Sequence, residues 1–156
     1  MVKPTPCKPL ILTKLPQPLI ANPMQISRKI ANQLLHWAQC SPDKEICGLL
    51  AGSNNQPTHC YPIKNVAENP QQRFLLDPAG QIDAMRTIRE QHEQLLAIFH
   101  SHPHAPARPS ATDLEDALYP DVLNLIISLN TKGLLEMRGF IINNKIAEEI
   151  TLTLIE

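Results

Sequence analysis

Residues 99–113, FHSHPHAPARPSATD, gather side chains that can hold a metal ion. His100 and His102 are two positions apart, and in an extended strand such side chains point to the same side. Ser110 and Asp113 are three positions apart at an expected helix start, so they share a face. Pro103 ends the strand and stiffens the turn. The spacing therefore predicts that the loop turns Asp113 back to face the two histidines.

Two histidines and one carboxylate form a common catalytic zinc set, with ligand distances of about 2.0–2.2 Å and a fourth position for water. Zinc lowers the pKa of that water toward neutrality and so provides a nucleophile at ordinary pH. We therefore expect one Zn²⁺ per chain, held by His100, His102 and Asp113. Ser110 is a candidate donor to the oxyanion of a hydrolytic reaction.

Such a site also needs a group that moves protons, and the stretch itself has no spare acid in a suitable place. Glu45, in KEICGLLAG, stands where a helix exit meets a buried strand. Gly48 and Gly52 would let neighbouring backbone come close there. Spacing alone does not choose Glu45 over the other acids upstream, which are Glu68, Glu90 and Glu93.

The elements that must position these residues follow from hydrophobic periodicity and turn residues. Helices are expected over 27–40, 78–94 and 110–118, with Ser27, Asp77 and Ser110 as N-caps. The inner face of the second helix is expected to carry Ile82, Met85, Ile88, His92 and Leu95. Strands are expected over 46–53, 58–67, 74–77, 95–100, 122–129, 134–142 and 146–155. This order predicts an α/β or α+β fold with a central mixed sheet flanked by helices.

Composition narrows the class of protein. The chain has 156 residues and a formal net charge of -1, which suits one domain and argues against a nucleic-acid or anionic-membrane partner. Residues 1–23 are rich in proline and are expected to form an arm, followed by one domain over 24–156. We find no signal-peptide pattern and no apolar run of about 20 residues, so we expect a cytoplasmic protein.

The four cysteines, at positions 7, 40, 47 and 60, include no C-x-x-C pair. Neither a zinc knuckle nor a redox pair is therefore indicated, and the thiols are expected to stay reduced. Cys47 and Cys60 are expected to be small buried hydrophobic residues in strands.

The pattern formed by Glu45, then H-S-H-P at 100–103, six residues, Ser110, two residues and Asp113 resembles the JAMM motif of the JAB1/MPN/Mov34 metalloproteases. The resemblance extends over roughly residues 24–155. It implies that His100, His102 and Asp113 ligate zinc and that Glu45 is the general acid/base. It further implies that Ser110 stabilises the oxyanion, that Ser101 and Pro103 support the site, and that the fold is similar to the cytidine deaminase architecture.

The resemblance also implies a reaction, because the family hydrolyses peptide or isopeptide bonds at the C-terminal tails of ubiquitin and ubiquitin-like proteins. Only 55 positions (100 − 45) separate Glu45 from His100, which leaves no room for large insertions. The chain is therefore interpreted as the compact prokaryotic type, whose expected partner is a ubiquitin-like or sulfur-carrier protein ending in Gly-Gly. Peptide and isopeptide bonds both remain open, as do the oligomeric state and the purpose of the proline-rich arm.

Three other functions are compatible with parts of the sequence: an interaction scaffold, a deaminase and a DNA-associated protein. A non-catalytic MPN-type interaction scaffold is the alternative, although such relatives usually lose metal ligands that this chain keeps. A zinc nucleobase deaminase calls for H-x-E and P-C-x-x-C, which are missing here. A DNA-associated relative is disfavoured by the net charge of -1 and the scattered basic residues. His104 and Arg108 are expected to be solvated loop residues, and His36, His59 and His92 to be ordinary helix or strand residues.

Overall fold

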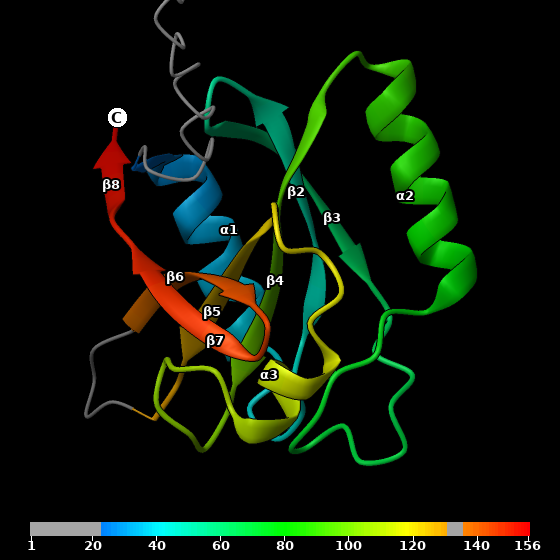
Figure 1. Ribbon diagram of the computed structural model, residues 1–156, viewed down its shortest axis with the longest axis vertical. Coiled ribbons are helices and arrows are strands. Elements are labelled where there is room, and N and C mark those ends of the chain that lie inside the picture. Colours follow the sequence, from blue (N-terminus) through cyan, green and yellow to red (C-terminus); the bar gives the residue numbers. More distant parts are fainter. Residues whose placement is uncertain (1–22, 131–135) are drawn as a thin grey trace, which may run out of the picture.

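The computed structural model describes residues 23–130 and 136–156, which form one six-stranded sheet, one two-stranded sheet and three helices (Figure 1). In chain order, the elements are β1 (Met24–Ser27), α1 (Arg28–Gln39), β2 (Cys47–Ser53), β3 (Gln56–Ile63), α2 (Pro78–Glu90), β4 (Gln94–His102), α3 (Ala111–Asp116), β5 (Leu123–Ser128), β6 (Glu136–Asn143), β7 (Ile146–Ile150) and β8 (Leu152–Ile155).

The large sheet has the strand order β3-β2-β4-β5-β6-β7. β4 and β5 pair in parallel and the other neighbouring strands are antiparallel, so the sheet is mixed, as the sequence predicts. The small sheet pairs β1 with β8 in parallel, which places Met24 beside Leu152. The predicted α+β class with a central mixed sheet flanked by helices is confirmed.

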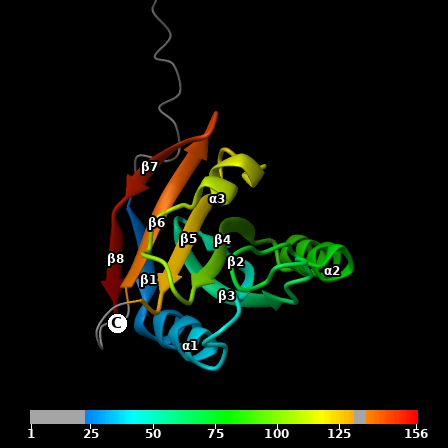
Figure 2. The same cartoon turned by 90° about the horizontal axis from the view of Figure 1, so that it is seen from below.

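Helices cover both faces of the large sheet (Figure 2). On one face, Ile30, Leu34 and Ala38 of α1 pack on a core that includes Phe99 and Leu125. On the other face, α2 packs through Ala84 and Ile88 over β2 and β3, and α3 lies over β5 and β6. Since side chains alternate along a strand, the two faces of β4 serve different layers. Phe99 and Ser101 point toward the α1 side, and Ile98, His100 and His102 point toward α2 and α3.

Local sequence explains the helix starts. The Ser27 hydroxyl accepts a hydrogen bond from the Ile30 N–H at 3.2 Å, and the Asp77 carboxylate accepts one from the Gly80 N–H at 3.2 Å. Both residues are the predicted N-caps. The two tight hairpins turn on residue pairs with positive φ, Asn54–Asn55 and Asn144–Lys145, a conformation typical of two-residue turns. None of the helices in the described part of the chain is both long and apolar enough to span a membrane.

Several element predictions are wrong in instructive ways. Residues 74–77 form no strand and make only an isolated bridge between Leu76 and Asn65. α2 ends at Glu90, and His92 follows it with a φ of 55°. Ile82 is 60% exposed and so does not lie on the inner face, which is formed by Ala84 and Ile88.

Element boundaries also differ from the predictions. The strand predicted over 146–155 is two strands, β7 in the large sheet and β8 in the small one, and β1 was not predicted as a strand. β4 runs on to His102, and α3 is shorter than predicted, at six residues. The proline-rich arm and residues 134–135 of the strand predicted over 134–142 lie outside the described residues, apart from Pro23.

Candidate metal centre

The C-terminal end of β4 and the start of α3 bring His100, His102 and Asp113 together. The Nε2 atoms of His100 and His102 lie 3.1 Å apart, and Asp113 Oδ2 lies 3.2 Å from the first and 3.1 Å from the second. The three residues are buried, with 1%, 3% and 9% of their surfaces exposed. The loop thus turns Asp113 back toward the histidines, as the spacing predicts.

The start of α3 fixes the position of Asp113. The Ser110 hydroxyl accepts a hydrogen bond from the Asp113 N–H at 3.0 Å, and Asp113 Oδ2 accepts one from the Ser110 N–H at 2.9 Å. This reciprocal pair is a capping box, in which two otherwise unpaired N–H groups at the helix start are satisfied. The same Asp113 carboxylate therefore caps α3 and contacts the two histidines.

The hydrogen-bond chemistry of the three atoms fits a cation. His102 Nδ1 lies 2.7 Å from the Pro106 carbonyl oxygen. Because a carbonyl only accepts, Nδ1 carries the hydrogen and a neutral His102 presents a lone pair at Nε2. That lone pair faces the oxygen of Asp113 and the ring nitrogen of His100. A single proton bridges only two of these three atoms, whereas a metal ion bonds all three.

The spacing of the three atoms fits as well. Tetrahedral zinc with bonds of about 2.0–2.1 Å separates its ligand atoms by about 3.3–3.4 Å. The observed triangle has sides of 3.1–3.2 Å and is close to that size. His100, His102 and Asp113 therefore offer a preformed, buried face of three donor atoms to a small divalent cation.

Glu45 is the acid that the fold brings to this site. Its carboxylate has an oxygen within 4.8 Å of the histidine nitrogens, and only 5% of the residue is exposed. Glu45 Oε1 is buried and has no hydrogen-bond partner among the described residues. The other upstream acids lie elsewhere, since Glu68 and Glu90 are exposed and Glu93 pairs with His59 at 2.7 Å.

Burial and neighbouring charges set the electrostatics of the cluster. Burial raises the pKa of Glu45 to about 7; positive charge on His102 opposes this rise and the negative charge of Asp113 adds to it. Burial also lowers the pKa of His100. Burial would raise the pKa of the Asp113 carboxyl, but its interactions with the neighbouring imidazoles of His100 and His102 outweigh burial and hold that pKa well below the usual range. Asp113 is therefore an anion near neutral pH.

Ser110, Ser101 and Pro103 take three different places. Ser110 is half-buried, and its hydroxyl oxygen accepts a hydrogen bond from the Asp113 N–H. Among the described residues the hydroxyl hydrogen has no acceptor, so it is available to donate. Ser101 is fully buried on the opposite face of β4, where its hydroxyl accepts a hydrogen bond from the Ile46 N–H at 2.8 Å. Pro103 directly follows β4 and is buried. His104 lies apart from the cluster, exposed and 4.0 Å from Asp43, as expected of a loop residue.

Sequence reasoning missed three contributors to the site. The Phe74 ring stacks on the His100 ring, the Pro106 carbonyl binds His102, and the Asn65 side chain binds the Glu45 carbonyl oxygen at 3.0 Å. Pro106 acts through its backbone carbonyl, and a contact of this kind cannot be predicted from the type of the residue. Phe74 and Asn65 act through the path of the 64–77 segment, and the one signal for it was an asparagine, a typical turn residue, near the end of the strand predicted over 58–67.

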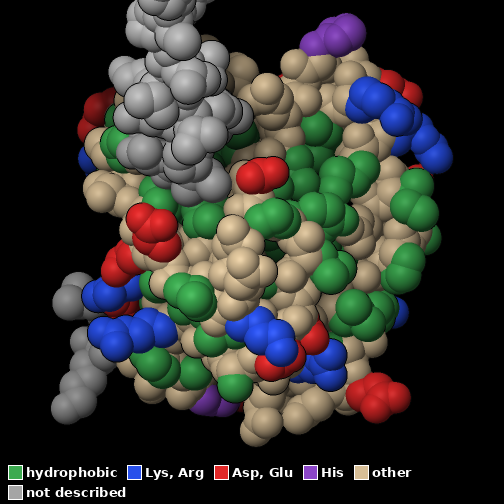
Figure 3. All heavy atoms as spheres, in the orientation of Figure 1, with side chains coloured by type: hydrophobic (Ala, Val, Ile, Leu, Met, Phe, Trp, Pro, Cys, Tyr) green, Lys and Arg blue, Asp and Glu red, His purple; other side chains and the backbone are tan. Residues whose placement is uncertain are grey.

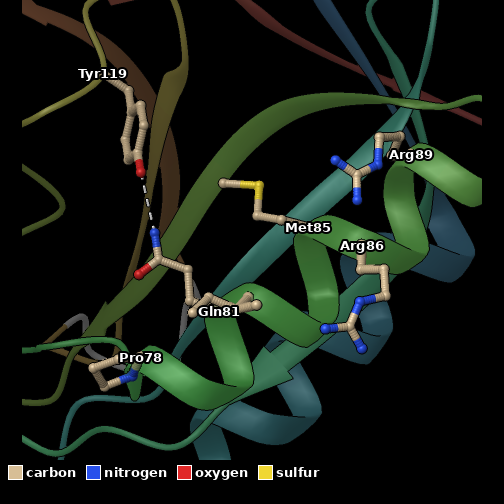
Figure 4. A pocket seen from close by; sticks show the side chains of 7 residues that line it. Pro78, Gln81, Met85, Arg86, Arg89 and Tyr119 are labelled. Atoms are coloured by element: carbon tan, nitrogen blue, oxygen red, sulfur yellow. Dashed lines mark hydrogen bonds between the residues drawn. The ribbon is translucent and has the colours of Figure 1, made fainter.

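A groove adjoins the cluster beside Asp113. It has a volume of about 340 Å³, and Phe74, Leu75, Leu118 and Tyr119 are among its lining residues. A second pocket of about 490 Å³ continues along α2, lined by Pro78, Gln81, Ile82, Met85, Arg86, Arg89 and Tyr119 (Figure 4). A hydrogen bond of 3.1 Å from Gln81 to the Tyr119 hydroxyl stands at the junction of the two. Hydrophobic side chains gather on this face beside α2 (Figure 3).

Two curated relatives are similar over much of the chain. The desampylase of Haloferax volcanii is 36% identical over 89 residues, which are 56% of this chain and 64% of the Haloferax protein. The match thus spans a little under two thirds of that protein's length. The CysO-cysteine peptidase of Mycobacterium tuberculosis is 28% identical over 127 residues, which are 80% of this chain and 86% of the peptidase.

A solved structure and a family model agree with these similarities. The solution structure of a protein from Desulfitobacterium hafniense superimposes with a TM-score of 0.77 at 32% identity, covering 85% of this chain and 93% of that one. The model for prokaryotic homologs of the JAB domain matches residues 27–139, which include Glu45 and the whole 99–113 stretch. The chain belongs to this prokaryotic JAB-domain family.

Proposed function

We propose that this chain is a zinc metallopeptidase that hydrolyses the peptide or isopeptide bond after the C-terminal Gly-Gly tail of a ubiquitin-like or sulfur-carrier protein. The observation that carries the proposal is the triangle of His100 Nε2, His102 Nε2 and Asp113 Oδ2, with sides of 3.1–3.2 Å. The names of the Haloferax and mycobacterial relatives, a desampylase and a CysO-cysteine peptidase, support the substrate class.

His100, His102 and Asp113 would hold the zinc ion. When bound at such a site, zinc activates water near neutral pH and polarises the carbonyl under attack. The donor set of two imidazoles and one carboxylate suits zinc and leaves a position open for chemistry. The buried Asp113 stays ionised, so it contributes a full negative charge that attracts a divalent cation.

Glu45 would move the proton. Its carboxylate lies beside the histidines, and its Oε1 has no hydrogen-bond partner among the described residues. There the carboxylate can take a proton from the attacking water and deliver it to the nitrogen of the leaving amine. A carboxyl group whose pKa is raised toward neutrality both accepts and returns a proton near pH 7. Neither step requires Glu45 to ligate the metal.

Ser110 would stabilise the negative charge that develops on the carbonyl oxygen of the substrate. Its oxygen is occupied as the cap of α3, and its hydrogen is free to point toward the substrate. A donor that helix capping already holds in place needs no reorganisation during the reaction.

The tail of the substrate would lie in the groove beside Asp113. The groove is lined largely by apolar and aromatic residues and leads past Phe74 to Tyr119. Glycines have no side chain, so a Gly-Gly segment passes close to a buried metal centre where bulkier residues would collide with its walls.

The experiment is to measure metal content and cleavage in the same preparations. Purified protein should carry about one zinc per chain by elemental analysis. It should cleave a ubiquitin-fold carrier that is extended beyond its Gly-Gly, and intact-mass spectrometry should locate the cut after the second glycine. Glu45→Gln should keep the zinc and lose turnover by about 10²–10⁴-fold, whereas the exposed Glu68→Gln should behave as wild type.

Two outcomes would contradict the proposal, namely protein active without zinc and an active Glu45→Gln variant. Zinc binding without any cleavage would instead favour the non-catalytic scaffold. We also propose a cytoplasmic location, which is supported by the free thiols of Cys40, Cys47 and Cys60 in the described part of the chain, since thiols stay reduced there.

A further inference from the structure

Phe74 and His100 form a ring stack at the candidate metal centre. Their ring centroids lie 4.3 Å apart and their planes differ by 21°. Phe74 reaches the histidine from the loop between β3 and α2, which contributes none of the predicted ligands. It also packs against the cluster of buried residues that includes Cys47, Leu76 and Ile98. The ring is therefore fixed on one side by the core and on the other side by the imidazole.

The two histidines differ in what orients them. His102 is held by the hydrogen bond from Nδ1 to the Pro106 carbonyl, at 2.7 Å. His100 Nδ1 is buried and has no hydrogen-bond partner among the described residues. Metal-ligating histidines usually donate their second ring nitrogen to a partner that fixes the ring. At His100, the Phe74 stack is the contact that can set the plane of the imidazole in place of that hydrogen bond.

Asn65 holds the backbone on both sides of Phe74. Its Nδ2 donates to the Arg73 carbonyl at 3.0 Å, and its Oδ1 accepts from the Leu75 N–H at 3.0 Å. The same side chain also donates to the Glu45 carbonyl at 3.0 Å and accepts from the Ala67 N–H at 3.0 Å. One amide thus connects the segment that carries the predicted proton-transfer acid to the segment that carries the aromatic ring.

We propose that Phe74 is a positioning residue for His100, which it holds in a metal-binding orientation by ring stacking, with Asn65 fixing the loop behind it. The inference rests on the proposed function in one respect, that the site binds zinc. It assigns no catalytic role to Phe74, which acts only through the imidazole plane. It accounts for how the His100 ring is held although its buried Nδ1 has no partner among the described residues.

The test is zinc affinity, measured on metal-free protein by competition with a chromophoric chelator. Replacing partners that orient a metal ligand typically costs 10–100-fold in affinity, so Phe74→Ala should weaken zinc binding by about tenfold. Phe74→Leu keeps an apolar side chain but removes the planar face, and it should weaken binding in the same direction. Leu75→Ala is the matched control, because Leu75 neighbours Phe74, lines the same groove and is 55% exposed.

A second readout separates positioning from general loss of structure. Cobalt substituted for zinc reports ligand geometry through its visible absorption bands, and these should change in Phe74→Ala and Phe74→Leu but not in Leu75→Ala. Far-ultraviolet circular dichroism checks that each variant is folded. If Phe74→Ala does not fold, Phe74→Leu alone tests the positioning role.

The outcomes distinguish this inference from the function on which it rests. Wild-type zinc affinity and an unchanged cobalt spectrum in both folded Phe74 variants would overturn the positioning role and leave the metallopeptidase intact. Wild-type protein that binds no zinc would overturn the proposed function itself, and the positioning role with it.

Discussion

Ser101 and Ile46 are joined by two hydrogen bonds that tie the two halves of the site together. The Ile46 N–H donates to the Ser101 hydroxyl at 2.8 Å, and the Ser101 N–H donates to the Ile46 carbonyl at 3.0 Å. Ser101 stands between the two histidines, and Ile46 directly follows Glu45. The pair therefore sets how close the carboxylate of Glu45 comes to the imidazoles of His100 and His102.

Replacing Ser101 with alanine should separate metal binding from turnover. The variant leaves the Ile46 N–H without its partner, which should lower the free energy of unfolding by about 1 kcal/mol or slightly more. The histidines should still bind zinc, while kcat falls because Ile46, which directly follows Glu45, keeps only one of its two hydrogen bonds to Ser101. Urea unfolding, elemental analysis and steady-state kinetics check the three effects. Ser53→Ala, at the exposed end of β2, is the control, and an unchanged kcat in Ser101→Ala would contradict the anchoring role.

Ser110 should show two separable contributions. Ser110→Ala removes the cap of α3, at a cost of about 1 kcal/mol in the free energy of unfolding. It also removes the proposed oxyanion donor, which should reduce kcat by about 10²–10³-fold. Ser27→Ala is the matched control, because Ser27 caps α1 in the same way and lies outside the site. It should lose similar stability and keep its kcat. Equal kcat losses in both variants would show that the donor role is wrong.

Asn65→Asp tests the amide that connects the two segments. The aspartate keeps an acceptor for the Leu75 and Ala67 N–H groups but cannot donate to the Glu45 and Arg73 carbonyls when ionised. Two lost hydrogen bonds at about 1 kcal/mol each should lower the free energy of unfolding by about 2 kcal/mol. Asn69→Asp makes the same chemical change at an exposed residue and should have little effect. Thermal and urea unfolding measure the stability of both variants. Equal stability of the two would contradict the role of Asn65 in holding the Glu45 and Phe74 segments together.

Thiol labelling checks how the sheet buries its cysteines. Burial raises the pKa of Cys60 to about 12, and burial, together with the negative charge of Glu45, raises the pKa of Cys47 to about 12. A pKa above the working pH keeps the thiol protonated, so at pH 9 little reactive thiolate is present at either position. Iodoacetamide at pH 9 should therefore modify the exposed Cys40 before Cys47 and Cys60, as read by peptide mass spectrometry. Cys47 is buried as expected, whereas Cys60 is only half-buried. Rapid labelling of Cys60 in the folded protein would contradict its raised pKa.

The cluster of His100, His102 and Asp113 could be predicted from the sequence because its geometry is local. His100 and His102 follow the alternation of one strand, and Ser110 and Asp113 follow one helix start, so short-range rules place all four. Glu45 could not be chosen by such rules, because its approach depends on the pairing of β2 with β4. Only the resemblance to a known motif selected it from the other upstream acids.

The errors arise where tertiary contacts override local patterns. Residues 74–77 have strand-like composition, but the Arg73 carbonyl and the Leu75 N–H are both occupied by the Asn65 side chain, so no ladder forms there. β1 stabilises itself by pairing with β8, whose residues lie 128 positions away in the Met24–Leu152 pair (152 − 24). Ile82 fits the periodicity of a buried face, yet it lines the pocket along α2 because Ala84 and Ile88 make the contact with the sheet.

The distribution of the site along the chain has an evolutionary consequence. The predicted ligands all lie between residues 100 and 113, while the predicted proton carrier lies in a separate segment that reaches them only across the sheet. A descendant that lost the carboxylate at position 45 would keep its helix cap, its imidazole pair and its fold. Such a lineage would inherit a metal-bearing domain without turnover, free to be recruited for recognition. In this architecture, one substitution would therefore separate the proposed enzyme from a binding module.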